Sequence, residues 1–170
     1  MISLIKRGVT DIFGYPGGYI VPFMDALYKH KDEITTHICY NESGCAFAAN
    51  GYARVTGKVG VYFTTSGPGA VNALGGLADA WFDGIPLIGI CGNVPTLEMK
   101  GKSGIRQNGF QEMDLVSITK NITKLSVTPI NAEELPDVVE RAFNTVMIGR
   151  KGGAIIDFPY NIQRTDIVVG

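Results

Sequence analysis

Short apolar runs alternate along this chain with longer segments in which apolar residues recur at helical spacing. The short runs are rich in β-branched and aromatic residues, which favour strands. They predict strands over residues 11–14, 34–40, 59–65, 86–91, 125–127 and 153–158. The longer segments predict helices over residues 20–30, 42–57, 70–82 and 135–147, and the last of these carries one continuous apolar stripe.

The order of these elements predicts the fold class. Alternation of strands and helices is typical of a three-layer α/β fold, in which a mostly parallel sheet has helices on both faces. No internal repeat or linker divides the sequence, so residues 1–170 are expected to form a single domain. Ligands of such sheets bind beyond the carboxyl ends of the strands. The segments that could hold a ligand are therefore residues 15–18, 41–44, 65–69 and 92–109.

The composition excludes several classes of protein. The 45% of hydrophobic residues are enough for a substantial core, and the net charge of −1 gives no electrostatic footprint for nucleic acid or a membrane surface. The three cysteines lack metal-ligand spacing, so no metal site is expected from this chain. No apolar run approaches the roughly 20 residues of a membrane span, and no signal peptide begins the sequence. A cytoplasmic location is therefore expected.

Glu42 follows a predicted strand and opens a predicted helix. Acids are common at that position for a structural reason, because a negative charge complements the helix dipole. The next four residues, 43–46, are small, so this turn could also press against a flat ligand. On the residues alone, both interpretations stay open.

The turn Ser-Gly-Pro-Gly at residues 66–69 also follows a strand and opens a helix. A helix start of this kind can cradle a ligand, although a tight turn that needs glycine explains the sequence equally well. The turn matches neither the phosphate-binding Walker loop nor the dinucleotide fingerprint. The turn Tyr-Pro-Gly-Gly at residues 15–18 allows the same two interpretations.

Four motifs in fixed order resolve this ambiguity through a family resemblance. They are FGYPGG at 13–18, NESG at 41–44, ANGYAR at 49–54 and TSGPGA at 65–70. Together they resemble the N-terminal, pyrimidine-binding domain of the thiamine-diphosphate enzymes that act on 2-keto acids. Within these enzymes the sequence is most similar to the acetolactate synthases, in their large catalytic subunit. The likeness continues through NVPT at 93–96, FQE at 110–112 and DFP at 157–159.

The resemblance implies a catalytic role for Glu42. In the family, the matching carboxyl group hydrogen-bonds N1′ of the cofactor's aminopyrimidine and exchanges a proton with it, which promotes loss of the proton from C2 of the thiazolium. A partly buried glutamate suits such an exchange near neutral pH. The cofactor then acts as the electron sink for decarboxylation of pyruvate and for its carboligation to a second keto acid.

The resemblance also implies which other residues bind the cofactor and face the substrate. Residues 16–18 would lie near the thiazolium, and residues 66–72 would approach the pyrimidine. The implied cofactor-binding residues are Pro16, Gly17, Gly18, Glu42, Ser66, Gly67 and Asn72. The implied substrate-side residues are Phe110 and Gln111.

The sequence departs from the synthase pattern on the substrate side. Tyr19 stands where the synthases have a small residue, and Asn93 stands where they have glutamine. Residues 97–109 are longer than the matching synthase loop, and their cations could either bind an anionic substrate or face solvent. These departures leave the acceptor keto acid open. The alternatives are another 2-keto-acid decarboxylase or carboligase, or a non-catalytic α/β binding domain.

The family places the rest of its active site outside this domain. Its diphosphate group and Mg²⁺ are bound by a separate domain of another subunit, so a homodimer or tetramer is expected, and the synthases carry a further domain for FAD. No segment of this chain matches either domain. The chain alone is therefore expected to be inactive, as a piece of a longer enzyme or as one subunit of a split enzyme. The resemblance would place the enzyme in branched-chain amino acid biosynthesis.

Overall fold

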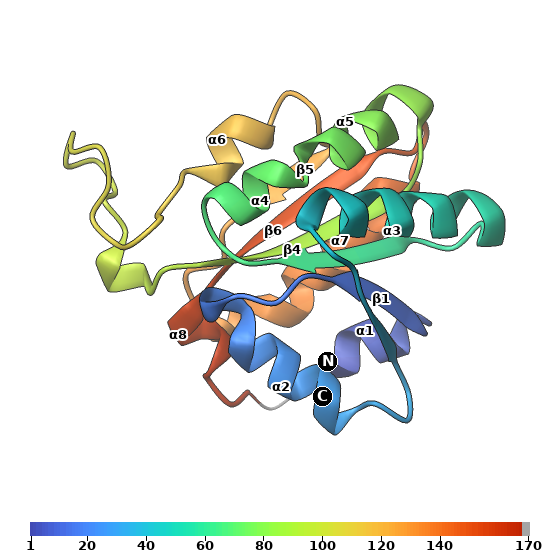
Figure 1. Cartoon of the computed structure of the whole chain (residues 1–170), viewed down its shortest axis with the longest axis horizontal. Helices are drawn as coiled ribbons and strands as arrows, with labels where there is room; N and C mark the ends of the chain where they lie inside the picture. Colours follow the sequence, from blue (N-terminus) through green and yellow to red (C-terminus); the bar gives the residue numbers. More distant parts are fainter. Residues whose placement is uncertain (168–170) are drawn as a thin grey trace.

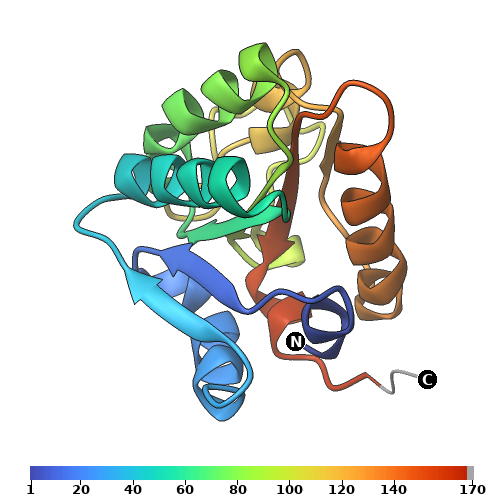
Figure 2. The same ribbon diagram turned by 90° about the vertical axis from the view of Figure 1, so that its right-hand side faces the viewer.

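The structure is a computed structural model that describes residues 1–167, and it contains a six-stranded sheet in which every described pair of strands is parallel. The strand order is β2-β1-β3-β4-β6-β5. The strands are β1 (Asp11–Gly14), β2 (Thr35–Ile38), β3 (Gly60–Thr64), β4 (Leu87–Asn93), β5 (Leu125–Val127) and β6 (Gly153–Pro159). Helices lie on both faces of this sheet (Figures 1 and 2). The expected three-layer α/β fold is confirmed.

One face of the sheet is covered by α1 (Ile2–Lys6), α2 (Val21–Lys29) and α7 (Leu135–Met147). The other face is covered by α3 (Glu42–Thr56), α4 (Pro68–Asn72), α5 (Leu74–Asp83) and α6 (Leu115–Thr119). Neighbouring residues of β3 point to opposite faces, as strand geometry requires. Val61 and Phe63 pack in the apolar core on the face that carries α1, α2 and α7, the first core. Tyr62 packs in the apolar core on the opposite face, the second core.

The sheet changes direction at β1. The chain passes from β1 through α2 to β2 on one side, and from β2 through α3 to β3 on the other side of β1. The two connecting helices therefore lie on opposite faces, and the carboxyl ends of β1 and β3 form the topological switch point of the sheet. Such switch points are where open parallel sheets bind ligands. The segments that leave β1 and β3 at this point are residues 15–18 and 65–69.

Most predicted elements are confirmed, and some with the same bounds. Residues 11–14, 125–127 and 135–147 form β1, β5 and α7. The helix expected over residues 42–57 is α3, which ends at Thr56 with Gly57 in the left-handed conformation that caps helices. Strand β4 runs two residues further than expected and ends at Asn93, so the loop expected from residue 92 begins later.

The single helix expected over residues 70–82 is wrong. The chain forms α4 and α5 there, separated by Ala73, whose ψ of −8° departs from helical geometry. The Ala73 N–H donates to the carbonyl of Ala70 at 3.2 Å, a tight bond that ends the first helix. The break lets α4 point toward α3 at Asn72 while α5 packs along α3.

Three short helices were not predicted, because four or five residues are too few to show a helical period. They are α1, α6 and α8 (Tyr160–Gln163). None of the helices within residues 1–167 is long and apolar enough to span a bilayer.

Candidate functional site

Glu42 is the first residue of α3, and its position is fixed by the cap before it. The side chain of Asn41 accepts a hydrogen bond from the N–H of Gly44 at 2.7 Å, as a helix N-cap does. The backbone of Asn41 is extended, with φ −162° and ψ 168°, so the chain turns sharply into the helix. The sequence after β2 therefore places a half-buried carboxyl group at the start of α3, beside the turn that follows β3.

The two oxygens of the Glu42 carboxyl group have different surroundings. Oε2 accepts a hydrogen bond from Nδ2 of Asn72 at 2.8 Å. Oε1 faces Gly69, where an added methyl group would lie only 3.0 Å from it. Within residues 1–167, Oε1 accepts no hydrogen bond from a protein group. One oxygen is thus held by α4, and the other is available to a ligand.

Two glycine turns meet at Thr65, which directly follows β3. A methyl group on Gly17 would lie 2.4 Å from Cβ of Thr65, and one on Gly69 would lie 2.8 Å from its Cγ2. Both distances are too short for real side chains. Thr65 therefore joins the turn after β1 to the turn that faces Glu42, a role that the sequence did not reveal.

The turn after β3 also contains an unsatisfied polar group. The side chain of Ser66 is 1% exposed, and its hydroxyl has no hydrogen-bond partner among residues 1–167. Buried hydroxyls without partners are uncommon and call for an explanation, such as a ligand. Next to it, Gly67 has φ +56°, and a methyl group there would lie 2.4 Å from the carbonyl oxygen of Gln111.

The structure thus bonds Glu42 to Asn72 and links Gly17 to the turn after β3 through Thr65, and it places Gln111 beside Gly67. The remaining expected site residues are less closely held. Pro16 and Gly18 are exposed, and a methyl group on Gly18 would meet no atom within 4 Å. Phe110 is 69% exposed.

A buried acid near the ends of β4 and β6 was not recognised in the sequence. Asp157 is 3% exposed and accepts hydrogen bonds from Nδ2 of Asn93 at 2.9 and 3.0 Å and from the hydroxyl of Thr128 at 2.8 Å. Burial raises the pKa of Asp157 to about 6, although both hydrogen bonds act to lower it. A lone acid within the apolar strand at 153–158 was the available signal.

The thiols of the second core are inert. Burial raises the pKa of Cys45 to about 12, and Cys39 and Glu42 add to this shift. Burial likewise raises the pKa of Cys91 to about 12. Because the thiolate is the reactive form, neither residue is a candidate nucleophile. No group of three or more histidine, cysteine or acidic residues within residues 1–167 is arranged to hold a metal ion.

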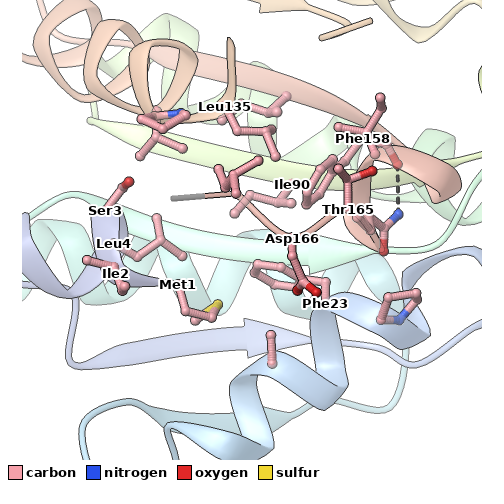
Figure 3. A pocket seen from close by; sticks show the side chains of 18 of the residues that line it. Met1, Ile2, Ser3, Leu4, Phe23, Ile90, Leu135, Phe158, Thr165 and Asp166 are labelled. Carbon is pink, nitrogen blue, oxygen red and sulfur yellow. Dashed lines mark hydrogen bonds between the residues drawn. The ribbon is translucent and has the colours of Figure 1, made fainter. Parts of the chain in front are cut away.

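A cavity of about 300 Å³ lies away from these residues, on the face of the sheet that carries α1, α2 and α7. Figure 3 shows it between Leu4, Phe23, Ile90 and Phe158, and most of its lining is apolar. None of the expected site residues contributes to this lining. The candidate site is therefore the group of residues around Glu42 and the turn after β3 rather than this cavity.

Comparisons with known proteins show the family of the chain. Residues 1–118 match the family model described as thiamine pyrophosphate enzyme, N-terminal TPP binding domain. The chain is 43% identical over 167 residues to the acetolactate synthase of Arthrospira platensis. It is 44% identical over 161 residues to the acetolactate synthase isozyme 2 large subunit of Escherichia coli K12, and 41% identical over 162 residues to the chloroplastic acetolactate synthase 1 of rice, Oryza sativa subsp. japonica.

These matches cover nearly the whole chain but only part of each relative. They include 97%, 95% and 95% of this chain, respectively. The same regions amount to 28% of the Arthrospira protein, 28% of the Escherichia protein and 24% of the rice protein. The chain thus spans about a quarter of the length of these relatives.

Proposed function

The chain belongs to the thiamine pyrophosphate enzymes, as an N-terminal TPP binding domain, and from this premise we propose that it forms the pyrimidine-binding half of an active site in an acetolactate synthase. The observation that carries the proposal is the carboxyl group of Glu42, with one oxygen held by Asn72 and the other turned to the glycine turn. The relatives named acetolactate synthase support the choice of reaction.

The polar groups around Glu42 fit the hydrogen-bonding atoms of an aminopyrimidine ring. Gly69 lets the turn after β3 approach Oε1 of Glu42 closely, because a methyl group at 69 would lie 2.8 Å from Cγ2 of Thr65 and 3.0 Å from Oε1. The unpaired hydroxyl of Ser66 provides a further polar group at the same turn. A flat, polar heterocycle matches this combination of a carboxyl oxygen and a hydroxyl. Pro16, Gly17 and Gly18 would face the thiazolium from the turn after β1.

Glu42 would act by exchanging a proton with a ring nitrogen. When bound, thiamine diphosphate supplies a thiazolium that serves as the electron sink in decarboxylation of 2-keto acids. The carboxyl group at 42 would donate a proton to the N1′ nitrogen of the cofactor and take it back, and Asn72 would keep the carboxyl oriented by holding Oε2. General acid–base catalysis of this kind contributes about 10²–10⁴-fold in rate.

The remainder of the active site is assigned on the likeness to the synthases. Phe110 and Gln111 would face the keto-acid substrate, and pyruvate would be the donor. A diphosphate-binding domain would supply the Mg²⁺ site from another subunit of a homodimer or tetramer, and FAD would bind elsewhere in the complete protein. The cytoplasmic location and the role in branched-chain amino acid biosynthesis stay predictions.

The test compares Glu42→Gln with wild type in the complete gene product that contains this chain. Glutamine can bond to N1′ but cannot exchange the proton, so deuterium exchange at C2 of bound thiamine diphosphate should slow by about 10²–10⁴-fold. Glu133→Gln is the matched control, because Glu133 is an exposed acid in the first turn of another helix. Exchange in the Glu42→Gln protein as fast as in wild type would contradict the assignment.

Product analysis with pyruvate, thiamine diphosphate and Mg²⁺ identifies the reaction. Acetolactate supports the synthase, whereas acetaldehyde alone would indicate a decarboxylase of the same family. A wild-type protein that shows neither product nor exchange at C2 would indicate a binding domain without catalysis.

A further inference from the structure

The segment between β4 and α6 is held together by one side chain, that of Glu112. The segment projects beyond the carboxyl ends of the strands, and residues 101–108 are exposed (Figure 1). One carboxyl oxygen of Glu112 accepts the N–H of Lys100 at 2.6 Å, and the other accepts the N–H of Asn108 at 2.7 Å. These two bonds close residues 100–108 into a loop whose ends are fastened to the same carboxyl group.

Both bonds are of the strong kind, in which a charged acceptor binds backbone donors. Lys100 adds a third contact, since its Nζ donates to the carbonyl of Arg106 at 3.2 Å across the loop. The ammonium group of Lys100 therefore contributes to the loop itself. We define residues 100–108 together with Glu112 as the clamped loop.

The base of the clamped loop is anchored on the sheet. Gly109 is buried against Val94, since a methyl group on Gly109 would lie 2.7 Å from a methyl carbon of Val94. The N–H of Val94 donates to the side chain of Asn93 at 2.8 Å, and Asn93 is bonded to Asp157. Gly109 thus seats the base of the loop that Glu112 closes against the carboxyl ends of β4 and β6.

Gln111, next to Glu112, has a strained backbone. Its φ is +56°, and within residues 1–167 no other residue except glycine has a positive φ. Such a conformation is costly for a side chain larger than glycine and persists only where the surroundings enforce it. The carbonyl of Gln111 occupies the space where Gly67 lacks a side chain, so the two backbones interlock. Strain of this kind is concentrated at functional sites.

We propose that Glu112 is a positioning residue, which holds the clamped loop shut and thereby sets Gln111 against the glycine turn of the cofactor site. The proposal rests on the proposed function for its consequence, which is binding of the keto-acid substrate. Glu112 touches neither cofactor nor substrate in this scheme. It acts through Gln111, whose strained backbone needs a fixed neighbour on each side.

The rate of trypsin cleavage tests whether Glu112 holds the clamped loop closed, because Lys100, Lys102 and Arg106 are cleavage sites within the loop. Glu112→Gln keeps the size of the side chain but replaces one acceptor oxygen by an NH₂ group, which cannot accept either N–H. Cleavage at these sites should become at least about tenfold faster, as expected for the loss of one charge-assisted hydrogen bond. Glu98→Gln is the control, since Glu98 is exposed in the same segment and its side chain makes no hydrogen bond there.

The enzyme assay in the complete gene product separates positioning from general stability. In Glu112→Gln, KM for the keto acid should rise about tenfold, whereas deuterium exchange at C2 should stay within about twofold of wild type. Glu112→Asp keeps both acceptor oxygens, so it should restore part of the trypsin resistance and part of the affinity. This partial rescue is not expected if any change at 112 merely unfolds the protein.

Each result decides one part of the proposal. Wild-type resistance to trypsin in Glu112→Gln would overturn the clamp. Faster cleavage with an unchanged KM would overturn the effect on substrate binding. Absence of C2 exchange in the wild-type protein would contradict the proposed function and with it the substrate part, while the trypsin result would still decide the clamp.

Discussion

Ionisation of Asp157 should destabilise the folded chain. Its carboxyl group is buried, and burial raises the pKa of Asp157 from 3.8 to about 6. The folded state therefore binds this proton more tightly than the unfolded state does. Between about pH 4 and pH 6 the folded chain holds more protons, so its stability falls as the pH rises through that window. A shift of about two pKa units corresponds to about 3 kcal/mol, lost in full above pH 6.

Asp157→Asn removes this ionisation and keeps one acceptor oxygen for Asn93 or Thr128. The free energy of unfolding of the variant will differ from that of wild type in two ways. One difference is constant and reflects the altered hydrogen bonds, and the other depends on pH because only wild type has the ionisable group. The free energy of unfolding, measured by urea denaturation from pH 4 to pH 8, separates the two. The free energy of the variant minus that of wild type should increase by about 3 kcal/mol between pH 4 and pH 7.

Asp114→Asn is the matched control. A hydrogen bond from the Ser117 hydroxyl, followed by one from its backbone N–H, lowers the pKa of Asp114 below 3.8. Its contribution is therefore already complete above the unfolded pKa and is lost only at lower pH. The difference between this variant and wild type should be nearly flat from pH 4 to pH 8, with only a small slope because the charge of Asp114 is the smallest of the causes that act on the pKa of Asp157. A flat difference for Asp157→Asn as well would refute the idea that burial dominates at that site.

Two glycine substitutions test the close contacts of the fold, both by urea denaturation. Gly17→Ala should cost about 1–3 kcal/mol, because the new methyl group would lie 2.4 Å from Cβ of Thr65, whereas Gly18→Ala should change the stability by less than about 0.5 kcal/mol. Equal effects of these two variants would contradict the contact with Thr65. Gly76→Ala should also lower the stability by about 1–3 kcal/mol, because its methyl group would lie 2.7 Å from Cβ of Ala46 and push α5 away from α3. An unchanged stability would show that the two helices can separate freely.

The sequence predicted the layers of this fold because local patterns specify them. Strands such as 11–14 and helices such as 135–147 show their period within a few residues, and the alternation fixes the parallel topology. The break at Ala73 has no such periodic signal in the sequence. It depends on how α4 and α5 each pack on α3, which is a tertiary effect that overrides the favourable helical composition of residues 70–82.

The candidate site also has parts that the sequence predicts and parts that it does not. The place of Glu42 at a helix start could be predicted, because Asn41 is a recognisable cap. The contacts of Thr65 with two glycine turns could not be predicted, since they join segments about 50 residues apart in sequence. The same holds for Asp157, whose partners come from two other parts of the chain. Long-range pairs of this kind have no periodic signal in the sequence.

The double attachment of Glu112 has a consequence for how this protein can diversify. Because both ends of residues 100–108 are fixed to one carboxyl group, the residues between them are free to change in number and kind. Lengthening a flexible loop is inexpensive, at about 0.6 kcal/mol for each doubling of its length. The clamped loop is thus a replaceable part, in which evolution or a designer can exchange cations, aromatics or extra residues while the turn at Gln111 keeps its shape.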